Sequence, residues 1–200
     1  MKLPILSVLS IGLLFNSCAQ APQKEVRKRE VVQIQTQFEL QDFLKENKDL
    51  DAAVDKVFAT LDDTAIVAQL IMPAVGRLGQ EKATIEQHIK DRIIGGVLML
   101  NGTKEGFTSW IADFEKQNKT NGNLPFLYSA DAEPSLVNRK ITGSTLVKKA
   151  NEMKSIEEVR TCAQTISKDL NDIGINYNFS PVVDMSPNAT VGFRSFGAVP

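Results

Sequence analysis

Short apolar runs alternate with amphipathic stretches along most of this chain. The amphipathic stretches place apolar side chains three or four positions apart, which is the spacing of one helix face. We predict helices at residues 83–93, 105–119 and 155–173. The apolar runs lack polar alternation, and we predict strands at residues 97–100, 124–130 and 175–183. Such strands, separated by helices, indicate an α/β fold with a parallel sheet buried on both faces.

The residues before these elements are predicted to be helical. Apolar residues recur at helical spacing across residues 38–61. The Asp62-Asp63 pair can begin a second helix, whose apolar continuation, residues 65–75, contains Pro73. Because proline does not continue a helix, this segment is expected to turn into a first strand.

Local sequence also predicts where helices begin and end. Ser155 opens a Ser-x-x-Glu capping box, and Gly174 is placed to end the same helix. The Gly95-Gly96 pair is expected to end the helix at 83–93.

Charged and amide side chains follow the predicted strands. Asp131 and Glu133 come directly after the run at 124–130, and Asn101 and Asp184 follow the runs before and after it. The carboxyl ends of the strands carry the functional site both in doubly wound sheets and in (β/α)8 barrels. The pattern does not choose between these folds, but in either one these side chains are expected to converge.

The first 37 residues differ in composition from the rest. Residues 1–18 combine a short basic start, an apolar run too short to span a bilayer, and a final cysteine, as in a bacterial lipoprotein signal peptide. Cleavage before Cys18 would leave its thiol for lipid, and residues 19–37 would form a flexible tether. The lipid would anchor the protein in the membrane of the cell envelope, facing the periplasm or the exterior. The alternative is an ordinary secretory signal with an incidental cysteine.

Charge and cysteine content exclude several functional classes. With 24 acidic and 23 basic residues, the chain lacks the basic excess typical of nucleic-acid-binding proteins. Cys162 is the only cysteine besides Cys18, so no disulfide framework is expected. The single histidine, His88, and the lack of a Cys-x-x-Cys motif argue against a metal site, and no cofactor is expected.

Four stretches carry a resemblance to a known family: IGGVLML, LPFLYSADAE, SKDLNDIGINYNFSPVVDMSPN and RSFG, in that order. Together they resemble the N-terminal half of glycoside hydrolase family 3, in particular the β-N-acetylhexosaminidases that act on cell-wall sugars. The resemblance covers residues 62–200. It implies that residues 38–200 form the N-terminal part of a TIM-type (β/α)8 catalytic barrel, and it favours the barrel over the doubly wound sheet.

The resemblance also implies a carbohydrate-binding site. Asp131 matches the aspartate that holds sugar hydroxyls in the −1 subsite, and Arg139, eight positions later, matches an arginine that contacts substrate. Arg194 matches the arginine of the Arg-Ser-Phe-Gly stretch, another sugar contact. These residue types suit the task, since a carboxylate accepts bonds from hydroxyl groups and a guanidinium donates them in a planar fork.

One departure from the family concerns the loop after the second predicted apolar run. The family usually reads Asp-Gln-Glu-Gly-Gly where this chain reads Asp-Ala-Glu-Pro-Ser, residues 131–135. Proline restricts its own φ and the conformation of its predecessor, so the loop over the subsite is expected to differ.

A second departure concerns catalysis. In the hexosaminidase branch the nucleophilic aspartate and the acid/base histidine lie beyond the Arg-Ser-Phe-Gly stretch, so no catalytic residue is expected within residues 1–200. The resemblance therefore implies retaining hydrolysis of terminal β-N-acetylhexosaminides by a longer chain, with possible further C-terminal domains. Two alternatives remain: a non-catalytic carbohydrate-binding lipoprotein and an unrelated α/β binding protein.

Overall fold

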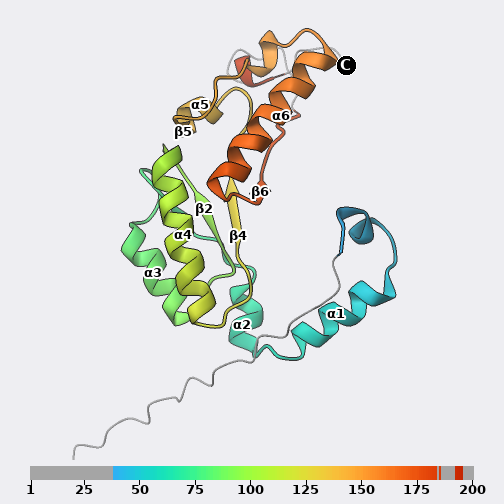
Figure 1. Cartoon of the computed structure of the whole chain (residues 1–200), viewed down its shortest axis with the longest axis vertical. Coiled ribbons are helices and arrows are strands. Elements are labelled where there is room, and N and C mark those ends of the chain that lie inside the picture. Colours follow the sequence, from blue (N-terminus) through green and yellow to red (C-terminus); the bar gives the residue numbers. More distant parts are fainter. Residues whose placement is uncertain (1–37, 184, 186–191, 196–200) are drawn as a thin grey trace, which may run out of the picture.

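The computed structural model describes residues 38–183, 185 and 192–195 (Figure 1). The predicted signal peptide, the tether, Cys18 and Asp184 lie outside the described residues. Within the described part of the chain, no helix has the length and apolar character needed to cross a membrane.

The centre of the fold is a four-stranded sheet in which all neighbouring strands are parallel. The strand order is β1-β2-β4-β6. These strands are β1 (Ala74–Val75), β2 (Gly96–Met99), β4 (Leu127–Ala130) and β6 (Tyr177–Asn178). A second, two-stranded parallel pair joins β3 (Gly102–Thr103) to β5 (Ile141–Thr142). The predicted parallel sheet is confirmed, although its strands are shorter than the apolar runs that predicted them.

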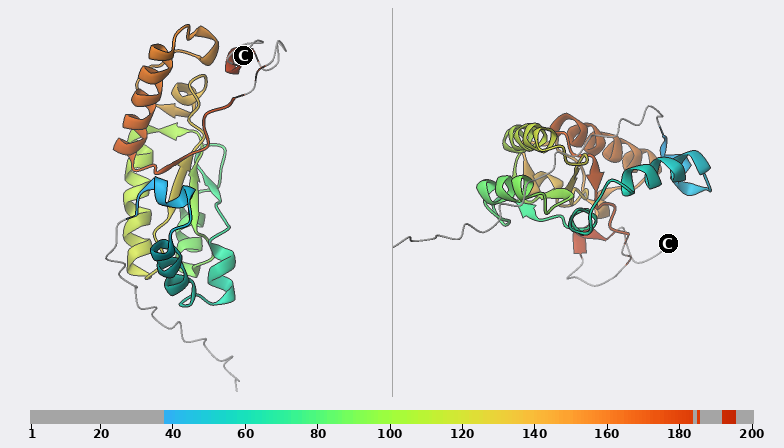
Figure 2. Two further views of the ribbon diagram at one scale, coloured as in Figure 1. Left: turned by 90° about the vertical axis from the view of Figure 1, so that its right-hand side faces the viewer. Right: turned by 90° about the horizontal axis from the view of Figure 1, so that it is seen from below.

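Three helices lie along one face of the sheet, and each connects two of its strands. Seen from below, they follow one another along that face (Figure 2). They are α3 (Lys82–Asp91), α4 (Lys104–Thr120) and α6 (Ile156–Ile173). The remaining helices are η1 (Leu40–Leu44), α1 (Lys48–Phe58), α2 (Asp63–Ala68), α5 (Val137–Lys140), η2 (Ala150–Glu152) and η3 (Gly192–Arg194).

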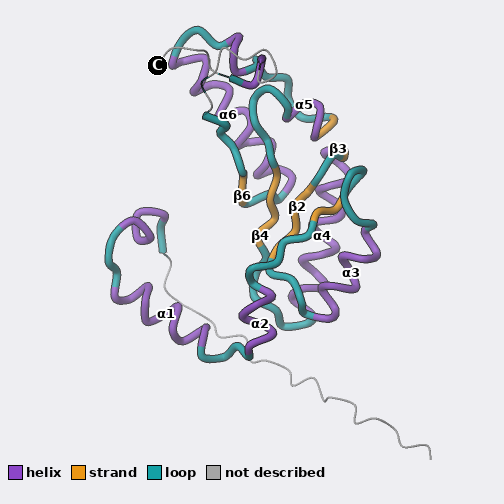
Figure 3. Tube along the Cα trace, turned by 180° about the vertical axis from the view of Figure 1, so that it is seen from behind, coloured by secondary structure: helices purple, strands orange, loops and turns teal. Residues whose placement is uncertain are grey.

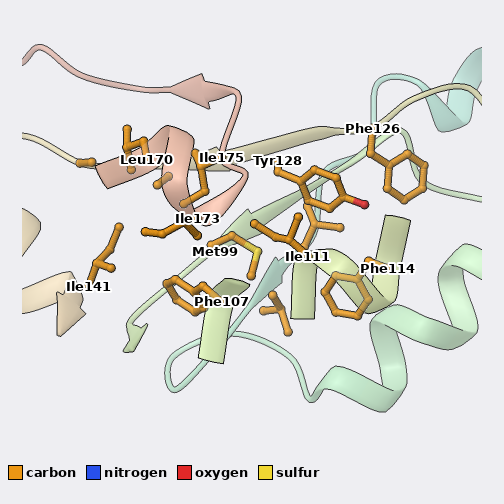
Figure 4. Packing of buried hydrophobic residues seen from close by; sticks show 14 of the residues in the cluster. Met99, Phe107, Ile111, Phe114, Phe126, Tyr128, Ile141, Leu170, Ile173 and Ile175 are labelled. Atoms are coloured by element: carbon orange, nitrogen blue, oxygen red, sulfur yellow. The ribbon is translucent and has the colours of Figure 1, made fainter. Parts of the chain in front are cut away.

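The hydrophobic core fills the space between these three helices and the sheet (Figure 4). Strand residues Val97 and Tyr128 pair across β2 and β4, so their side chains point to the same, helix-covered face. Phe107 and Phe114 of α4 meet them there and are almost completely buried. Burying one such side chain contributes about 1.5–3 kcal/mol, so this layer holds the strands in place.

The opposite face of the sheet differs from the prediction that both faces are buried. Leu127 and Tyr177 on this face are 49% and 46% exposed. Ser129, between them, is fully buried, and its hydroxyl lies 2.9 Å from the sulfur of Met72. The difference arises because the described residues place no second helix layer over this face.

Most predicted helix ends are confirmed. The side chains of Asp62 and Ser155 accept hydrogen bonds from the first turns of α2 and α6, and Gly174 ends α6 with φ 94°. The role predicted for Gly95 is wrong, since α3 ends earlier, at Asp91, and is capped by Arg92, which adopts φ 63°. Gly95 is needed for close packing instead: a Cβ there would lie 2.6 Å from the Cα of Gln69.

The N-terminal helices η1 and α1 stand apart from the sheet (Figure 3). None of their residues is buried, and Leu44 and Phe58 are 80% and 54% exposed. The apolar side chains of α1, from Leu50 to Phe58, instead line a shallow groove together with Phe38 and Leu61. The helical spacing of residues 38–61 thus predicts helices correctly, but the apolar side chains of α1 face this groove and not the core.

Candidate carbohydrate site

The predicted site begins where β4 ends. Asp131 directly follows Ala130, the last residue of β4, and its side chain is 34% exposed. After a turn, the one-turn helix α5 brings the chain back, and Lys140 Nζ donates to Asp131 Oδ2. The ammonium group lies against the carboxylate, so it orients Asp131 and compensates part of its charge.

Arg139, predicted to share the site with Asp131, is exposed, and its side chain has no hydrogen-bond or ion-pair partner among the described residues. Successive residues of a helix point about 100° apart, so Arg139 and Lys140 cannot both face Asp131. The structure thus brings Lys140, and not Arg139, to the aspartate. Lys140 was missed by sequence reasoning, because adjacent basic residues give no sign of which one turns inward.

A second charged pair lies two residues further along. Arg194, from η3, donates from Nε to Glu133 Oε1 at 2.6 Å and from Nη2 to Glu133 Oε2 at 3.2 Å. The Glu133 side chain is only 2% exposed, whereas that of Arg194 is 41% exposed. This two-point geometry holds the guanidinium plane in one orientation.

The predicted residues Asp131 and Arg194 are therefore linked through the short segment that carries both carboxylates. The sequence predicts Glu133 only as a charge at the strand end; the structure adds that it is buried and paired with Arg194. The arrangement presents two oriented charged pairs, which together offer acceptors and donors to a polyhydroxylated ligand.

The loop after β4, residues 135–150, is closed by hydrogen bonds between its own residues. Ser135 Oγ, in the place of a family glycine, accepts a hydrogen bond from the Ala150 amide at 3.0 Å. The Asn138 side chain donates to the carbonyl of Thr145 at 2.7 Å and accepts from the amide of Val147 at 3.1 Å. A glycine has no side chain for the first of these contacts, so Ser135 adds an anchor to this loop.

Asp169 of α6 fastens the same loop to the helix layer. Its carboxylate, 7% exposed, accepts from Lys104 Nζ at 2.7 Å and from the amide of Thr145 at 2.5 Å. Burial raises the pKa of Asp169, but the hydrogen bonds from Lys104 and Thr145 together outweigh burial, and its net pKa lies below the usual value. The ionised carboxylate is thus the form that the folded protein stabilises.

Asp169→Asn is expected to lower the free energy of unfolding at pH 7 by about 1.5–3 kcal/mol, because the change removes a charge-assisted acceptor from a buried site. Since the folded protein lowers the pKa, this stabilisation is present above the ordinary aspartate pKa and is lost as the pH falls through the lowered value. Denaturant titrations of both proteins between pH 7 and pH 2 should therefore converge at the acid end.

Asp172→Asn is the matched control for that comparison. Asp172 also contacts Lys104, at 3.5 Å, but its side chain is 43% exposed. Solvent screens such a pair, so a smaller loss is expected. A difference between wild type and Asp169→Asn that stays constant down to pH 2 would contradict the role assigned to the charge.

A hollow of about 410 Å³ lies beside the loop, between α6 and the residues around β6. It is lined by Ala132, Pro134 and mostly apolar side chains of α6, and by none of the four residues of the two charged pairs. The hollow and the charged pairs are thus separate features. Nowhere among the described residues do three His, Cys, Asp or Glu side chains gather as metal ligands.

Comparison with curated proteins finds relatives along the same part of the chain. Two proteins named beta-hexosaminidase LpqI, from Mycobacterium tuberculosis and Mycobacterium bovis, are 28% and 27% identical over 141 residues. Each match covers 67% of this chain and 35% of the relative. The chain thus spans about a third of the length of these relatives.

Solved structures agree on the fold. A glycoside hydrolase family 3 β-N-acetylglucosaminidase from Paenibacillus sp. str. FPU-7 matches with a TM-score of 0.59 and 26% identity, over 68% of this chain and 28% of that protein. The β-glucoside phosphorylase BglX matches with a TM-score of 0.65 over 78% of this chain and 28% of that protein, at 16% identity. These likenesses confirm the prediction that the strands and helices form part of a TIM-type barrel.

The model of the glycosyl hydrolase family 3 N-terminal domain matches residues 60–200, which include β1 to β6 and both charged pairs. This match confirms the resemblance carried by the four sequence stretches. The chain belongs to glycosyl hydrolase family 3.

Proposed function

We propose that the complete protein is a glycosidase that hydrolyses terminal β-N-acetylhexosaminides, and that the described residues hold the sugar. The observation that carries this proposal is the pair of oriented ion pairs, Asp131 with Lys140 and Glu133 with Arg194, just beyond the carboxyl end of β4. Family membership supports the activity class, and the names of the curated relatives support the sugar.

The chemistry of the site fits this task. A pyranose presents hydroxyl groups in fixed directions, and the partly exposed carboxylate of Asp131 can accept hydrogen bonds from two of them. Lys140 fixes the orientation of that carboxylate before the sugar arrives. Hydrogen bonds that strengthen as the ring distorts toward an oxocarbenium-like transition state contribute to catalysis and not only to binding.

The proposal assigns the nucleophile and the acid/base to sequence beyond residue 200. Retaining glycosidases need both groups on opposite sides of the scissile bond. The described residues would then supply the substrate-binding wall of the site, while a longer chain supplies the reacting groups. Lipid attachment at Cys18 would hold the enzyme at the cell envelope; a mature protein that stays in the aqueous phase of a detergent extraction would contradict this.

The test is release of an aryl leaving group from an aryl β-N-acetylglucosaminide. The full-length protein is expected to turn over this substrate in preference to the matching β-glucoside, whereas purified residues 1–200 are expected to be inactive. General acid–base catalysis alone contributes a factor of about 10²–10⁴ to the rate, so a protein without the acid/base should release the aryl group far more slowly.

Two outcomes would contradict the proposal. Turnover by residues 1–200 that disappears with Asp131→Ala would show that the reacting groups lie within this part of the chain. Sugar binding by the full-length protein without any hydrolysis would instead favour a non-catalytic carbohydrate-binding protein.

A further inference from the structure

The side chain of Asn178 extends the contact between β4 and β6 beyond the end of the ladder. The last paired residues of these strands are Ala130 and Asn178. One step further, Asn178 Oδ1 accepts from the amide of Ala132 at 3.0 Å, and Asn178 Nδ2 lies 3.5 Å from the Ala132 carbonyl oxygen. The same Oδ1 accepts from the amide of Ser180 at 3.2 Å. Two backbone donors on one oxygen fix the orientation of the amide group.

Ala132 is the residue between the two carboxylates of the site. It is fully buried, and its methyl group offers no polar anchor of its own. Because peptide units are planar, a rotation at Ala132 would move the Cα atoms of both Asp131 and Glu133. A clamp on the backbone of Ala132 therefore controls the direction of both carboxylates at once.

The geometry points to Asn178 as a positioning residue for the sugar site, an inference that rests on the proposed function of that site. Asn178 holds the backbone of Ala132 in place. This backbone orients the Asp131 carboxylate toward Lys140 and the Glu133 carboxylate toward Arg194. Asn178 itself touches neither carboxylate in the contacts of the described residues, so it acts through the backbone.

The chain contains a matched control two residues earlier. Asn176 makes the same kind of clamp on β4: its Oδ1 accepts from the amide of Tyr128 at 2.9 Å, and its Nδ2 donates to the carbonyl of Phe126 at 3.1 Å. These contacts lie at the start of β4, away from the carboxylates. Alanine at either position removes a clamp between the same two segments, but only alanine at 178 releases the site.

The first measurement is amide hydrogen exchange in the full-length protein. Asn178→Ala is expected to speed exchange of the Ala132 amide while leaving Tyr128 protected, and Asn176→Ala is expected to do the reverse. Asn178→Asp keeps an acceptor for Ala132, so protection should return. Unchanged exchange at Ala132 in Asn178→Ala would overturn the clamp, whatever the protein's activity.

The second measurement is coupling to Arg194 in unfolding titrations. If Asn178 aims Glu133 at Arg194, the effects of Asn178→Ala and Arg194→Ala should be non-additive, whereas Asn176→Ala and Arg194→Ala should add. Additive effects in both cycles would overturn the positioning role without bearing on the glycosidase assignment.

The third measurement is kcat/KM for the aryl β-N-acetylglucosaminide. Asn178→Ala is expected to lower it on the order of 10- to 100-fold, since a displacement of about 1 Å at a binding group has effects of this size. Asn176→Ala should stay near wild type. Equal losses of kcat/KM in the two variants would overturn the link between the clamp and the site. An inactive wild-type protein would overturn the proposed function, and the clamp would then be tested by hydrogen exchange and by the unfolding titrations alone.

Discussion

Replacing Arg194 with alanine is expected to lower the free energy of unfolding by about 2–4 kcal/mol. The Glu133 carboxylate is 2% exposed and receives two hydrogen bonds from the Arg194 guanidinium. Removal of this partner leaves a buried charge without those bonds, and such losses cost about 3–5 kcal/mol when both partners are buried. Because the Arg194 side chain is 41% exposed, water can reach part of the space and the expected loss is smaller.

Chemical denaturation followed by circular dichroism measures this loss. The control is Glu133→Gln in the Arg194→Ala background. This change removes the unpaired charge of Glu133, keeps the size and shape of its side chain, and is expected to recover part of the stability. Arg194→Lys should recover less than the native pair gives, because an ammonium group cannot reproduce the two-point geometry. A double variant less stable than Arg194→Ala alone would show that the charge of Glu133 has another, stronger partner.

Asp131→Ala in the full-length protein is expected to lower kcat/KM for an aryl β-N-acetylglucosaminide by about 30- to 1000-fold, equivalent to about 2–4 kcal/mol. The carboxylate is oriented by Lys140 and is partly exposed, and under the proposed function it accepts hydrogen bonds from the sugar. The change also leaves Lys140 without its partner inside the site. Initial-rate kinetics over a range of substrate concentrations measures the effect.

Lys140→Ala and Arg139→Ala form the matched pair for this experiment. They are adjacent on α5, but only Lys140 contacts Asp131. Lys140→Ala is therefore expected to reduce kcat/KM, whereas Arg139→Ala should have the smaller effect. The opposite ranking would support the prediction made from the sequence, in which Arg139 contacts the substrate.

The order of strands and helices could be predicted because it depends on local patterns. Apolar runs and helical spacing predicted the alternation of β2, α4, β4 and α6, and the side chains of Asp62 and Ser155 begin their helices as expected. Strand lengths could not be predicted, because an apolar run pairs only where a neighbour lies alongside. β6 keeps two paired residues of the run at 175–183 for this reason.

The site was predicted only in part, and the reason is again the path of the chain. Asp131 follows a strand, so its placement at the strand end required no tertiary information. The partners Lys140 and Arg194 reach the carboxylates through a one-turn helix and through a segment about 60 residues later, as the 61-residue separation of the Glu133–Arg194 contact shows. Spacing in the sequence does not encode either path.

The closed loop after β4 has a consequence for how this family member can vary. Ser135 binds the Ala150 amide at its base and Asn138 ties its interior, while Thr145 is held from outside the loop by Asp169 of α6. Ile141 and Thr142 pair with β3, but Leu146 is 85% exposed, so substitutions at such exposed positions leave these anchors and Asp131 in place. Under the proposed function, contacts with the part of the glycan beyond the bound sugar could therefore diverge at the exposed positions of this loop, while its anchors keep Asp131 where it is.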